Sequence, residues 1–184
     1  NLRILSDAEF KDLYNASSAS LKPILRMAVH TGMRLGEILS LLWDDVNLKE
    51  GHLLVRDSKN YESRYIPLHP ELTSVLIDLK NRSDSEYVFG GRTTIKRQWA
   101  NAVKKSGIKH CRFHDLRHTF GSNLGMSGVD IVTVAELMGH KDLSITKRYS
   151  HPTPEHKKSA INRLSFIKVD TYMDTSVDIR DKTS

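Results

Sequence analysis

The densest group of side chains that could perform chemistry is the string His114-Asp115-Leu116-Arg117-His118. His114 and His118 are four residues apart, so on a helix they share one face, as the two histidines of the zinc-protease motif do. That motif has a glutamate after its first histidine and a third ligand downstream, whereas here Asp115 follows and the Arg117 guanidinium would repel a cation. His114 and Arg117, three residues apart, are better suited to bind one anion together. In isolation, the string indicates only a partly buried histidine beside a surface arginine.

Two further segments carry residues that could complete such an anion site. Residues 31–38, TGMRLGEI, place Arg34 at the start of a predicted helix, with Glu37 one turn later, where its carboxylate can hold the guanidinium. His140 comes directly after a helix-ending glycine in the segment LMGHKDLSIT, and Tyr149 follows nine residues later in a short predicted helix. Taken alone, a tyrosine in an amphipathic helix is usually a core residue.

Length and composition exclude several classes of protein. The 184 residues are enough for one domain with its own core. Cys111 is the single cysteine, so no internal disulfide can form, and we expect a reducing, cytoplasmic environment. No run of about 18 apolar residues occurs, and the first residues lack the apolar core of a signal peptide, so neither a membrane span nor secretion is expected. The chain begins with Asn1 rather than methionine, which suggests a fragment or a processed product.

The positive charge is concentrated in one stretch. The chain has a net charge of +6, but residues 91–118 alone carry eight basic side chains and one acidic, Asp115, while the remainder is close to neutral. A basic face of this kind is what a polyanion-binding surface requires, because each neutralised phosphate releases counterions. A solvated basic helix face is the alternative. The eight basic residues are Arg92, Lys96, Arg97, Lys104, Lys105, Lys109, Arg112 and Arg117.

Hydrophobic spacing and capping signals predict a mainly helical protein of the mixed α+β class. Ser6 and Glu9 form a capping-box signature, and Gly32 and Gly139 are typical helix ends. The segments 52–56 and 64–68 flank a polar stretch and predict an antiparallel β-hairpin with a long exposed turn. Helices are expected over residues 6–17, 21–30, 35–42, 70–80, 93–105, 114–125, 130–138, 144–150 and 154–164.

Taken together, these strings resemble the catalytic domain of the tyrosine recombinases, the phage integrase family. The resemblance covers residues 1–164 and rests on TGMRLGEI, SKN in the hairpin, HDLRH, LMGH and TKRYSH, in the family's order. It implies the fold of the DNA breaking-rejoining enzymes and a catalytic set that is complete in this chain. The assignment of Lys59 rests on a short local pattern and on the predicted hairpin. The implied catalytic residues are Arg34, Lys59, His114, Arg117, His140 and Tyr149.

Several of these residue types suit attack on a DNA phosphodiester. Arg34 and Arg117 can bind the non-bridging oxygens in forked fashion, and His140 can donate one more hydrogen bond. Tyr149 as the nucleophile would form a phosphotyrosyl ester that stores the bond energy, so rejoining needs no ATP.

Two residues are candidates for proton transfer. The phenol has an ordinary pKa of about 10 and needs a base or a positive field, and His114 is the candidate base. Lys59, a flexible ammonium at the hairpin turn, can give a proton to the departing 5′ oxygen. The resemblance implies a 3′-phosphotyrosyl link, no metal and no cofactor, and the sequence lacks the paired carboxylates of a two-metal nuclease.

The resemblance also implies partners. We expect double-stranded DNA as the substrate of an integrase of a mobile genetic element, a homo-tetramer during synapsis, possible accessory proteins, and a cytoplasmic location at the nucleoid. Residues 165–184 form a polar tail that is disordered or packs in trans. A type IB topoisomerase, a DNA-binding fragment with weak catalysis and a zinc hydrolase are the alternatives. Candidate DNA contacts outside the catalytic set are Lys96, Arg97, Lys104, Lys105 and Lys141, the last with an exposed loop lysine as its equally plausible interpretation.

Overall fold

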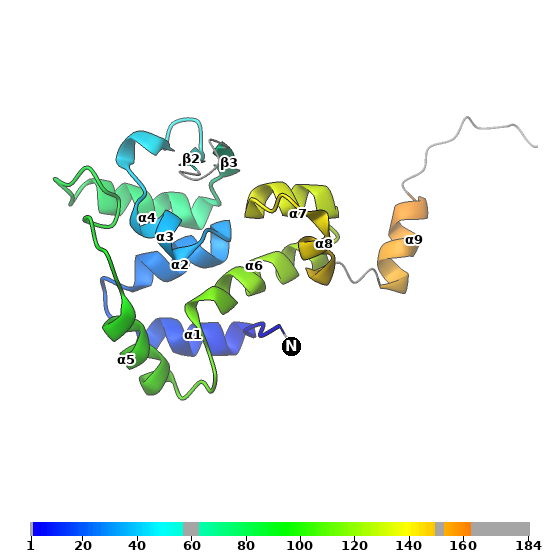
Figure 1. Ribbon diagram of the computed structural model, residues 1–184, viewed down its shortest axis with the longest axis horizontal. Helices are drawn as coiled ribbons and strands as arrows, with labels where there is room; N and C mark the ends of the chain where they lie inside the picture. The colour runs from blue at the N-terminus through cyan, green and yellow to red at the C-terminus, as the bar shows by residue number, and fades with distance from the viewer. Residues whose placement is uncertain (1, 57–62, 150–152, 163–184) are drawn as a thin grey trace, which may run out of the picture. The chain divides into compact units, whose positions relative to one another are not determined.

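The computed structural model describes residues 2–56, 63–149 and 153–162 (Figure 1). The chain divides into two compact units, residues 1–152 and 153–184, and each is described by itself. Lys59 and the predicted tail 165–184 lie outside the described residues. The helical elements bear out the expected class, a mainly α-helical fold with a small antiparallel sheet.

Helix α2 (Lys22–Thr31) lies at the centre of the first unit (Figure 1). Its apolar residues are buried on several sides because α3 (Leu35–Leu39), α4 (Pro70–Lys80) and α6 (Phe113–Met126) all pack against it. Gly32 ends α2 with a φ of 63°, a left-handed conformation that glycine adopts without strain, as the sequence predicts.

Helices α1 (Asp7–Ala16) and α5 (Lys96–Ser106) form a separate pair (Figure 1). The predicted capping box of α1 is present: Glu9 N donates to Ser6 Oγ at 3.2 Å, and Ser6 N donates to a Glu9 carboxylate oxygen at 2.9 Å. This pair turns its basic side toward solvent, since the charged residues of α5 are exposed while Ala102 is buried.

The sheet has three antiparallel strands in the order β1-β2-β3, namely Val46–Asn47, His52–Arg56 and Ser63–Pro67. The hairpin prediction is confirmed, with Leu53 opposite Ile66 and Val55 opposite Arg64. The prediction missed β1, which has only two residues and therefore no periodic signal. Leu53, Val55 and Ile66 alternate toward the core.

The predicted helix over residues 35–42 is too long. Helix α3 ends at Leu39 because the chain then pairs with a distant segment: Val88 N donates to Leu41 O and Trp43 N donates to Glu86 O, both at 2.9 Å. A short 3₁₀ helix, η1 (Trp43–Asp45), follows. These non-local hydrogen bonds are invisible to local sequence signals.

The chain after α6 packs back on that helix. Helix α7 (Ile131–Met138) begins at Asp130, whose carboxylate accepts from Val132 N and Thr133 N, and it ends at Gly139 with a φ of 66°. The predicted helix 144–150 is instead α8 (Leu143–Thr146) followed by the 3₁₀ helix η2 (Lys147–Tyr149). In the second unit, α9 spans Pro154–Asn162. None of the helices among the described residues is long and apolar enough to cross a membrane.

Candidate active site

The start of helix α6 is held by a carboxylate that belongs to the HDLRH string. Asp115 is fully buried, and its two oxygens accept from Arg112 N at 2.8 Å and from the Arg112 guanidinium at 2.9 Å. This satisfies the backbone N–H of Arg112, the residue that precedes the first turn of α6. Asp115 stands where the zinc-protease motif has its glutamate, but in the structure it has a capping role.

Arg117 is held by two backbone carbonyls. It is only 3% exposed, and its guanidinium donates to Gly32 O, at the end of α2, and to Met138 O at 2.5 Å, at the end of α7. Burial and the neighbouring charge of Arg34 lower the pKa of Arg117 to about 10, so it remains a cation at neutral pH. The guanidinium therefore joins the ends of two helices and is oriented before any ligand arrives.

Arg34 is oriented by Glu37, as the sequence predicts. The Glu37 carboxylate accepts from Arg34 N at 2.8 Å and from Arg34 Nη1 at 3.0 Å. It also accepts two bonds from Arg64 of β3, whose Nε donates to Leu137 O at 3.0 Å. Arg34 is exposed and Arg64 is largely buried, so one carboxylate holds one arginine at the surface and another inside. Burial of Glu37 acts to raise its pKa, but the Arg64 and Arg34 guanidinium groups outweigh it and the pKa is lowered.

His140 follows the left-handed Gly139. Its Nδ1 lies 2.8 Å from Thr146 Oγ1 of α8, and Thr146 is fully buried. Burial, followed by the charges of Arg117 and Arg34, lowers the pKa of His140 to about 4, so the ring is neutral at physiological pH. A neutral imidazole bonded through one nitrogen leaves the other available to a ligand.

Tyr149 is buried, at 4% exposure, in a small cluster with Phe120, Val134 and Met138. Its ring lies nearly parallel to that of His140, with 6.3 Å between centroids. The close approach of η2 to α6 depends on Gly125, because a Cβ at that position would lie 2.0 Å from Tyr149 O. Glycine is thus required there for steric reasons.

The structure brings together the five predicted catalytic residues that lie among the described ones. The charges of Arg34 and Arg117 act on both His114 and His140, and Tyr149 interacts with Arg117 and stacks on His140. Lys59 lies outside the described residues, so its place in the site stays a prediction. Such a cluster of two guanidinium groups, histidines and a phenol can bind a phosphodiester and present a nucleophile to it.

Sequence reasoning missed three contributors. Arg64 follows the SKN pattern, but no local signal links it to Glu37, because the two lie in different elements. Gly125 was not singled out. The HDLRH string shows His118 only at helical spacing from His114, whereas the structure places its Nδ1 2.7 Å from the Tyr149 hydroxyl oxygen.

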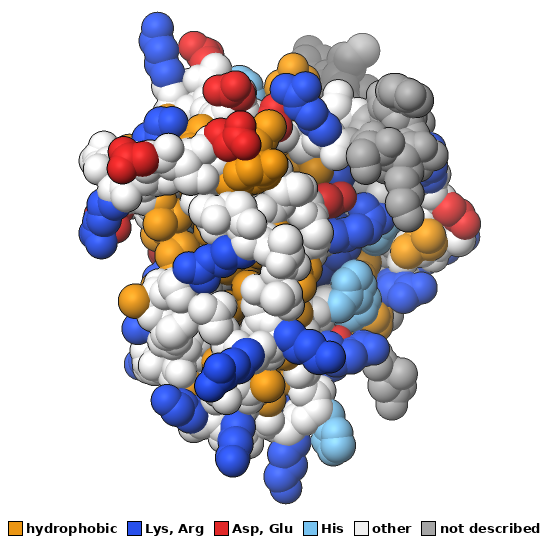
Figure 2. Space-filling view, turned by 60° about the vertical axis from the view of Figure 1, so that its left-hand side comes forward, with side chains coloured by type: hydrophobic (Ala, Val, Ile, Leu, Met, Phe, Trp, Pro, Cys, Tyr) orange, Lys and Arg blue, Asp and Glu red, His pale blue; other side chains and the backbone are white. Residues whose placement is uncertain are grey.

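The residues predicted to contact DNA lie on the surface. Lys96, Arg97, Lys104 and Lys105 are exposed along α5, and Lys141 is exposed next to His140. On the face drawn in Figure 2, Lys and Arg side chains gather in the lower half and most acidic ones lie above. Trp99 of α5 packs edge-on against Phe113 with 5.3 Å between ring centroids.

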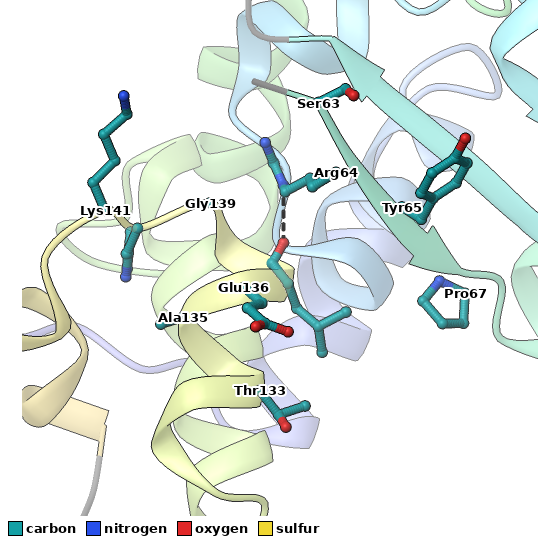
Figure 3. A pocket seen from close by; sticks show the side chains of 11 residues that line it. Ser63, Arg64, Tyr65, Pro67, Thr133, Ala135, Glu136, Gly139 and Lys141 are labelled. Carbon is teal, nitrogen blue, oxygen red and sulfur yellow. Dashed lines mark hydrogen bonds between the residues drawn. The ribbon is translucent and has the colours of Figure 1, made fainter. Parts of the chain in front are cut away.

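A cavity of about 640 Å³ lies beside the site, between β3 and α7. Its lining includes Arg64, Tyr65, Thr133, Glu136 and His140. Figure 3 shows Arg64 pointing from β3 toward the end of α7, where its hydrogen bond to the backbone is drawn, with Gly139 close by. A Cβ on Gly139 would lie 2.8 Å from Arg64 Nη1, so this glycine admits the guanidinium.

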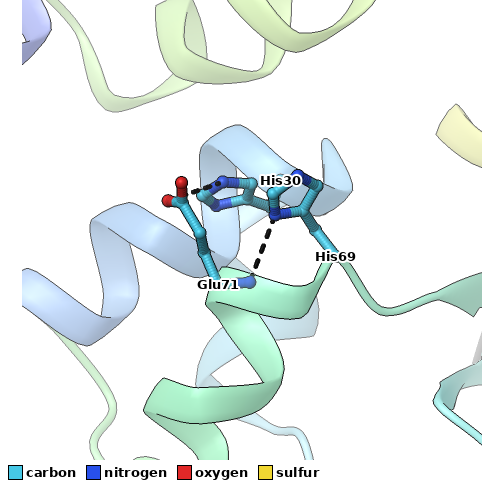
Figure 4. A group of neighbouring side chains, drawn as sticks. All are labelled: His30, His69 and Glu71. Carbon is cyan, nitrogen blue, oxygen red and sulfur yellow. Dashed lines mark hydrogen bonds and ion pairs between the residues drawn. The ribbon is translucent and has the colours of Figure 1, made fainter.

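Among the described residues, one group could ligate a metal ion: His30, His69 and Glu71, whose ligand atoms lie within 4.8 Å of one another (Figure 4). Each of them already has a structural partner. His30 Nδ1 bonds Arg26 O at 3.0 Å, His69 Nδ1 accepts from Glu71 N at 3.3 Å at the start of α4, and the Glu71 carboxylate pairs with Arg26. Through these contacts the three side chains join α2 to the start of α4.

Comparisons with known proteins agree with this geometry. The model of the phage integrase family matches residues 3–156. Tyrosine recombinase XerA of Pyrococcus furiosus is 33% identical over 157 residues, covering 79% of this chain and 54% of the relative. The integrase of Salmonella phage P22 is 28% identical over 174 residues, covering 84% and 45%. The chain thus spans about half the length of these curated relatives.

Solved structures give the same result at the level of the fold. The catalytic domain of bacteriophage HP1 integrase has a TM-score of 0.74 and 25% identity, covering 89% of this chain and 95% of that one. A crystal structure of XerA recombinase has a TM-score of 0.72 and 27% identity, with 89% and 66% coverage. The fold is therefore that of a tyrosine recombinase catalytic domain. The chain belongs to the phage integrase family.

Proposed function

We propose that this chain is the catalytic part of a site-specific DNA recombinase or integrase, which cuts and rejoins double-stranded DNA through a covalent 3′-phosphotyrosyl intermediate. The observation that carries the proposal is the convergence of Tyr149 with Arg117, Arg34 and His140 around one site. The names of the relatives, recombinase and integrase, support it.

The phosphodiester binds to the arginines. Arg117 is preoriented by its two carbonyl partners, and Arg34 reaches the surface from its pairing with Glu37. As charge builds on the non-bridging oxygens, both guanidinium groups and the free nitrogen of His140 donate to them. One preorganised donor of this kind contributes about 3–4 kcal/mol to transition-state stabilisation.

Tyr149 Oη attacks phosphorus, and the 5′ oxygen leaves as the phosphotyrosyl bond forms. Burial raises the pKa of Tyr149, while Arg117 and Arg148 act in the opposite direction, so the attacking group starts as the neutral phenol and must lose its proton. Lys59 supplies a proton to the leaving oxygen. Because the ester keeps the bond energy, the released 5′ hydroxyl of another strand can attack it without ATP or metal.

The DNA duplex is held mainly by the basic surface of α5. Its exposed Lys96, Arg97, Lys104 and Lys105 would contact backbone phosphates, and Lys141 would do so next to the site. Strand exchange between two duplexes requires four cleavages, and we propose that four copies of the whole protein assemble on DNA at the nucleoid.

Trapping of the covalent intermediate tests this function. DNA duplexes are enriched from a random-sequence pool by binding to the chain and are nicked near the cleavage site, so that a short leaving strand diffuses away. We expect an SDS-resistant protein–DNA adduct in the presence of EDTA, and its loss in Tyr149→Phe.

Tyr65→Phe is the matched control, since Tyr65 is 66% exposed on β3 and should leave adduct formation unchanged. An adduct that persists in Tyr149→Phe contradicts the assignment of the nucleophile. Dependence on added zinc would instead favour a hydrolase. Joined products between two duplexes distinguish a recombinase from a topoisomerase, which relaxes a single duplex.

A further inference from the structure

The hydroxyl of the proposed nucleophile contacts a histidine that lies outside the predicted catalytic set. His118 Nδ1 is 2.7 Å from Tyr149 Oη, and both side chains are buried, at 8% and 4% exposure. Among the described residues, this is the one hydrogen bond of the phenol. The two residues belong to α6 and η2, which pack directly on each other.

Both partners of this hydrogen bond are neutral at physiological pH. Tyr149 is a neutral phenol, as described above. Burial, followed by the neighbouring His114, lowers the pKa of His118 to about 4, so its ring is also neutral at physiological pH. A neutral imidazole has one donor and one acceptor nitrogen, and in the tautomer with its proton on Nε2 the phenol donates to Nδ1. A nucleophile that donates to a neutral imidazole has the geometry of nucleophile and base.

His114, the base predicted from the sequence, contacts the ring of His118 rather than the phenol of Tyr149. It is exposed, and its ring meets that of His118 edge-on with 4.6 Å between centroids. No hydrogen bond joins His114 to the phenol in the described part of the chain. The charges of Arg117, Arg112 and Arg34 act on His114, so it lies near the arginines proposed to bind the phosphate. Because its side chain is exposed, it is accessible to the substrate.

We propose that His118 is a catalytic residue that takes the phenol proton when Tyr149 attacks. The inference rests on the proposed function. In this step the Oη–H bond breaks and an Nδ1–H bond forms, the Oη–P bond forms and the P–O5′ bond breaks, and the proposed acid protonates O5′. On rejoining, a 5′ hydroxyl forms the new P–O5′ bond and returns its proton to the proposed acid, while the Oη–P bond breaks and Oη recovers its proton from His118.

Bound DNA makes His118 a stronger base than it is in the free protein. Four groups surround it: Arg112, His114 and Asp115 on its own helix, and Arg148 on η2. Three of these disfavour the protonated ring and only Asp115 favours it. A phosphodiester anion bound at Arg117 adds a negative charge nearby, and such a charge raises the pKa of an imidazole.

Substitutions that separate hydrogen bonding from proton transfer test the inference. His118→Asn keeps an acceptor near the position of Nδ1 but cannot take the proton, and His114→Asn is the matched variant one turn away. The rate of adduct formation on the enriched, nicked duplexes is measured between pH 6 and pH 10. We expect His118→Asn to react about 10²–10³-fold more slowly at neutral pH and to recover steeply as the pH approaches that of phenol ionisation. His114→Asn should lower the rate and retain the wild-type pH profile.

A His118→Asn rate within threefold of wild type, with an unchanged pH profile, would overturn the inference, and so would a steep pH dependence found in His114→Asn instead. Thermal melting and DNA-binding anisotropy check that each variant is folded. If His118→Asn is not folded, His118→Ala with added imidazole replaces it, and cleavage that imidazole does not increase refutes the role. Failure of the proposed function has a different signature, because then the wild type forms no adduct or Tyr149→Phe forms one.

Discussion

The two halves of the candidate site are built differently. The phosphate-binding half, Arg34 and Arg117, is tied to backbone carbonyls and to a carboxylate shared with Arg64. The elements that carry these residues belong to the large core around Leu25, Ile38 and Leu116. Tyr149, by contrast, lies in a cluster of four buried residues, and within the described part of the chain its hydroxyl is hydrogen-bonded by one side chain, His118.

The two halves therefore differ in how firmly the fold positions their side chains before any reaction. A guanidinium joined to two helix ends cannot move without disturbing the core, so the phosphate-binding half is preorganised. The proposed nucleophile, Tyr149, lies in the short 3₁₀ helix η2 at the end of the first unit's described residues, and its position depends on its contact with glycine and on the hydrogen bond with His118. Substitutions in the first half should therefore affect both stability and cleavage, and those in the second half mainly cleavage.

The largest effect is expected for Arg117→Met. The variant removes a preorganised donor, which costs about 10²–10³-fold in cleavage rate. It also leaves Gly32 O and Met138 O without their buried partner, which costs about 1–3 kcal/mol of unfolding free energy. Urea unfolding and adduct formation measure the two effects.

The control for this variant is Arg97→Met, on the exposed side of α5, which should leave the unfolding free energy unchanged. Loss of cleavage in Arg117→Met with full wild-type stability would contradict the coupling of stability and function in this half.

A smaller effect, confined to the nucleophile half, is expected for Gly125→Ala. The added Cβ would lie 2.0 Å from Tyr149 O, so η2 must shift away from α6. A displacement of this size should reduce cleavage by about 10–100-fold. The matched control is Gly36→Ala, because a Cβ at Gly36 meets nothing within 4 Å and should be tolerated.

Cleavage by Gly125→Ala at the wild-type rate would show that Tyr149 does not act from this position. Phosphate binding should be retained in the variant, and this is checked by DNA-binding anisotropy. A drop in cleavage with unchanged binding then locates the defect in the nucleophile half.

The sequence predicts the phosphate-binding half better than the nucleophile half, for a physical reason. Arg34 with Glu37, and His114 with Arg117, are local pairs at helical spacing, so short strings reveal them. The bond from His118 to Tyr149 spans 31 residues and forms only when η2 packs on α6. Similarly, α4 was predicted with its observed bounds from local signals, whereas the end of α3 depends on pairing with residues 86–88. Local patterns thus reveal which residues are present, and the packing decides which of them touch.

The smallest effect on cleavage is expected for Glu37→Gln, and the effect of this variant on stability depends on pH. Although burial opposes it, the pairing with Arg64 and Arg34 lowers the pKa of Glu37 below its ordinary 4.5. A carboxylate with a lowered folded-state pKa contributes stability above its unfolded pKa and loses it as the pH falls through the folded one. Urea unfolding at neutral pH should show the variant about 1–3 kcal/mol less stable than wild type. The difference should shrink as the pH falls below about 4.5, because the unfolded wild type then takes up a proton, and the charge contribution is lost below the lower pKa of the folded carboxylate.

Glu50→Gln serves as its control, since Glu50 is exposed and forms no ion pair among the described residues. That variant should follow the wild type at every pH. Cleavage by Glu37→Gln should fall only severalfold, because Arg117 keeps its carbonyl partners while Arg34 alone becomes less ordered. A difference between Glu37→Gln and wild type that persists unchanged at pH 4 would mean that packing of the side chain, rather than its charge, joins α3 to β3. In that case the contribution of Glu37 to the phosphate-binding half would rest on shape, as the contribution of Gly125 to the nucleophile half does.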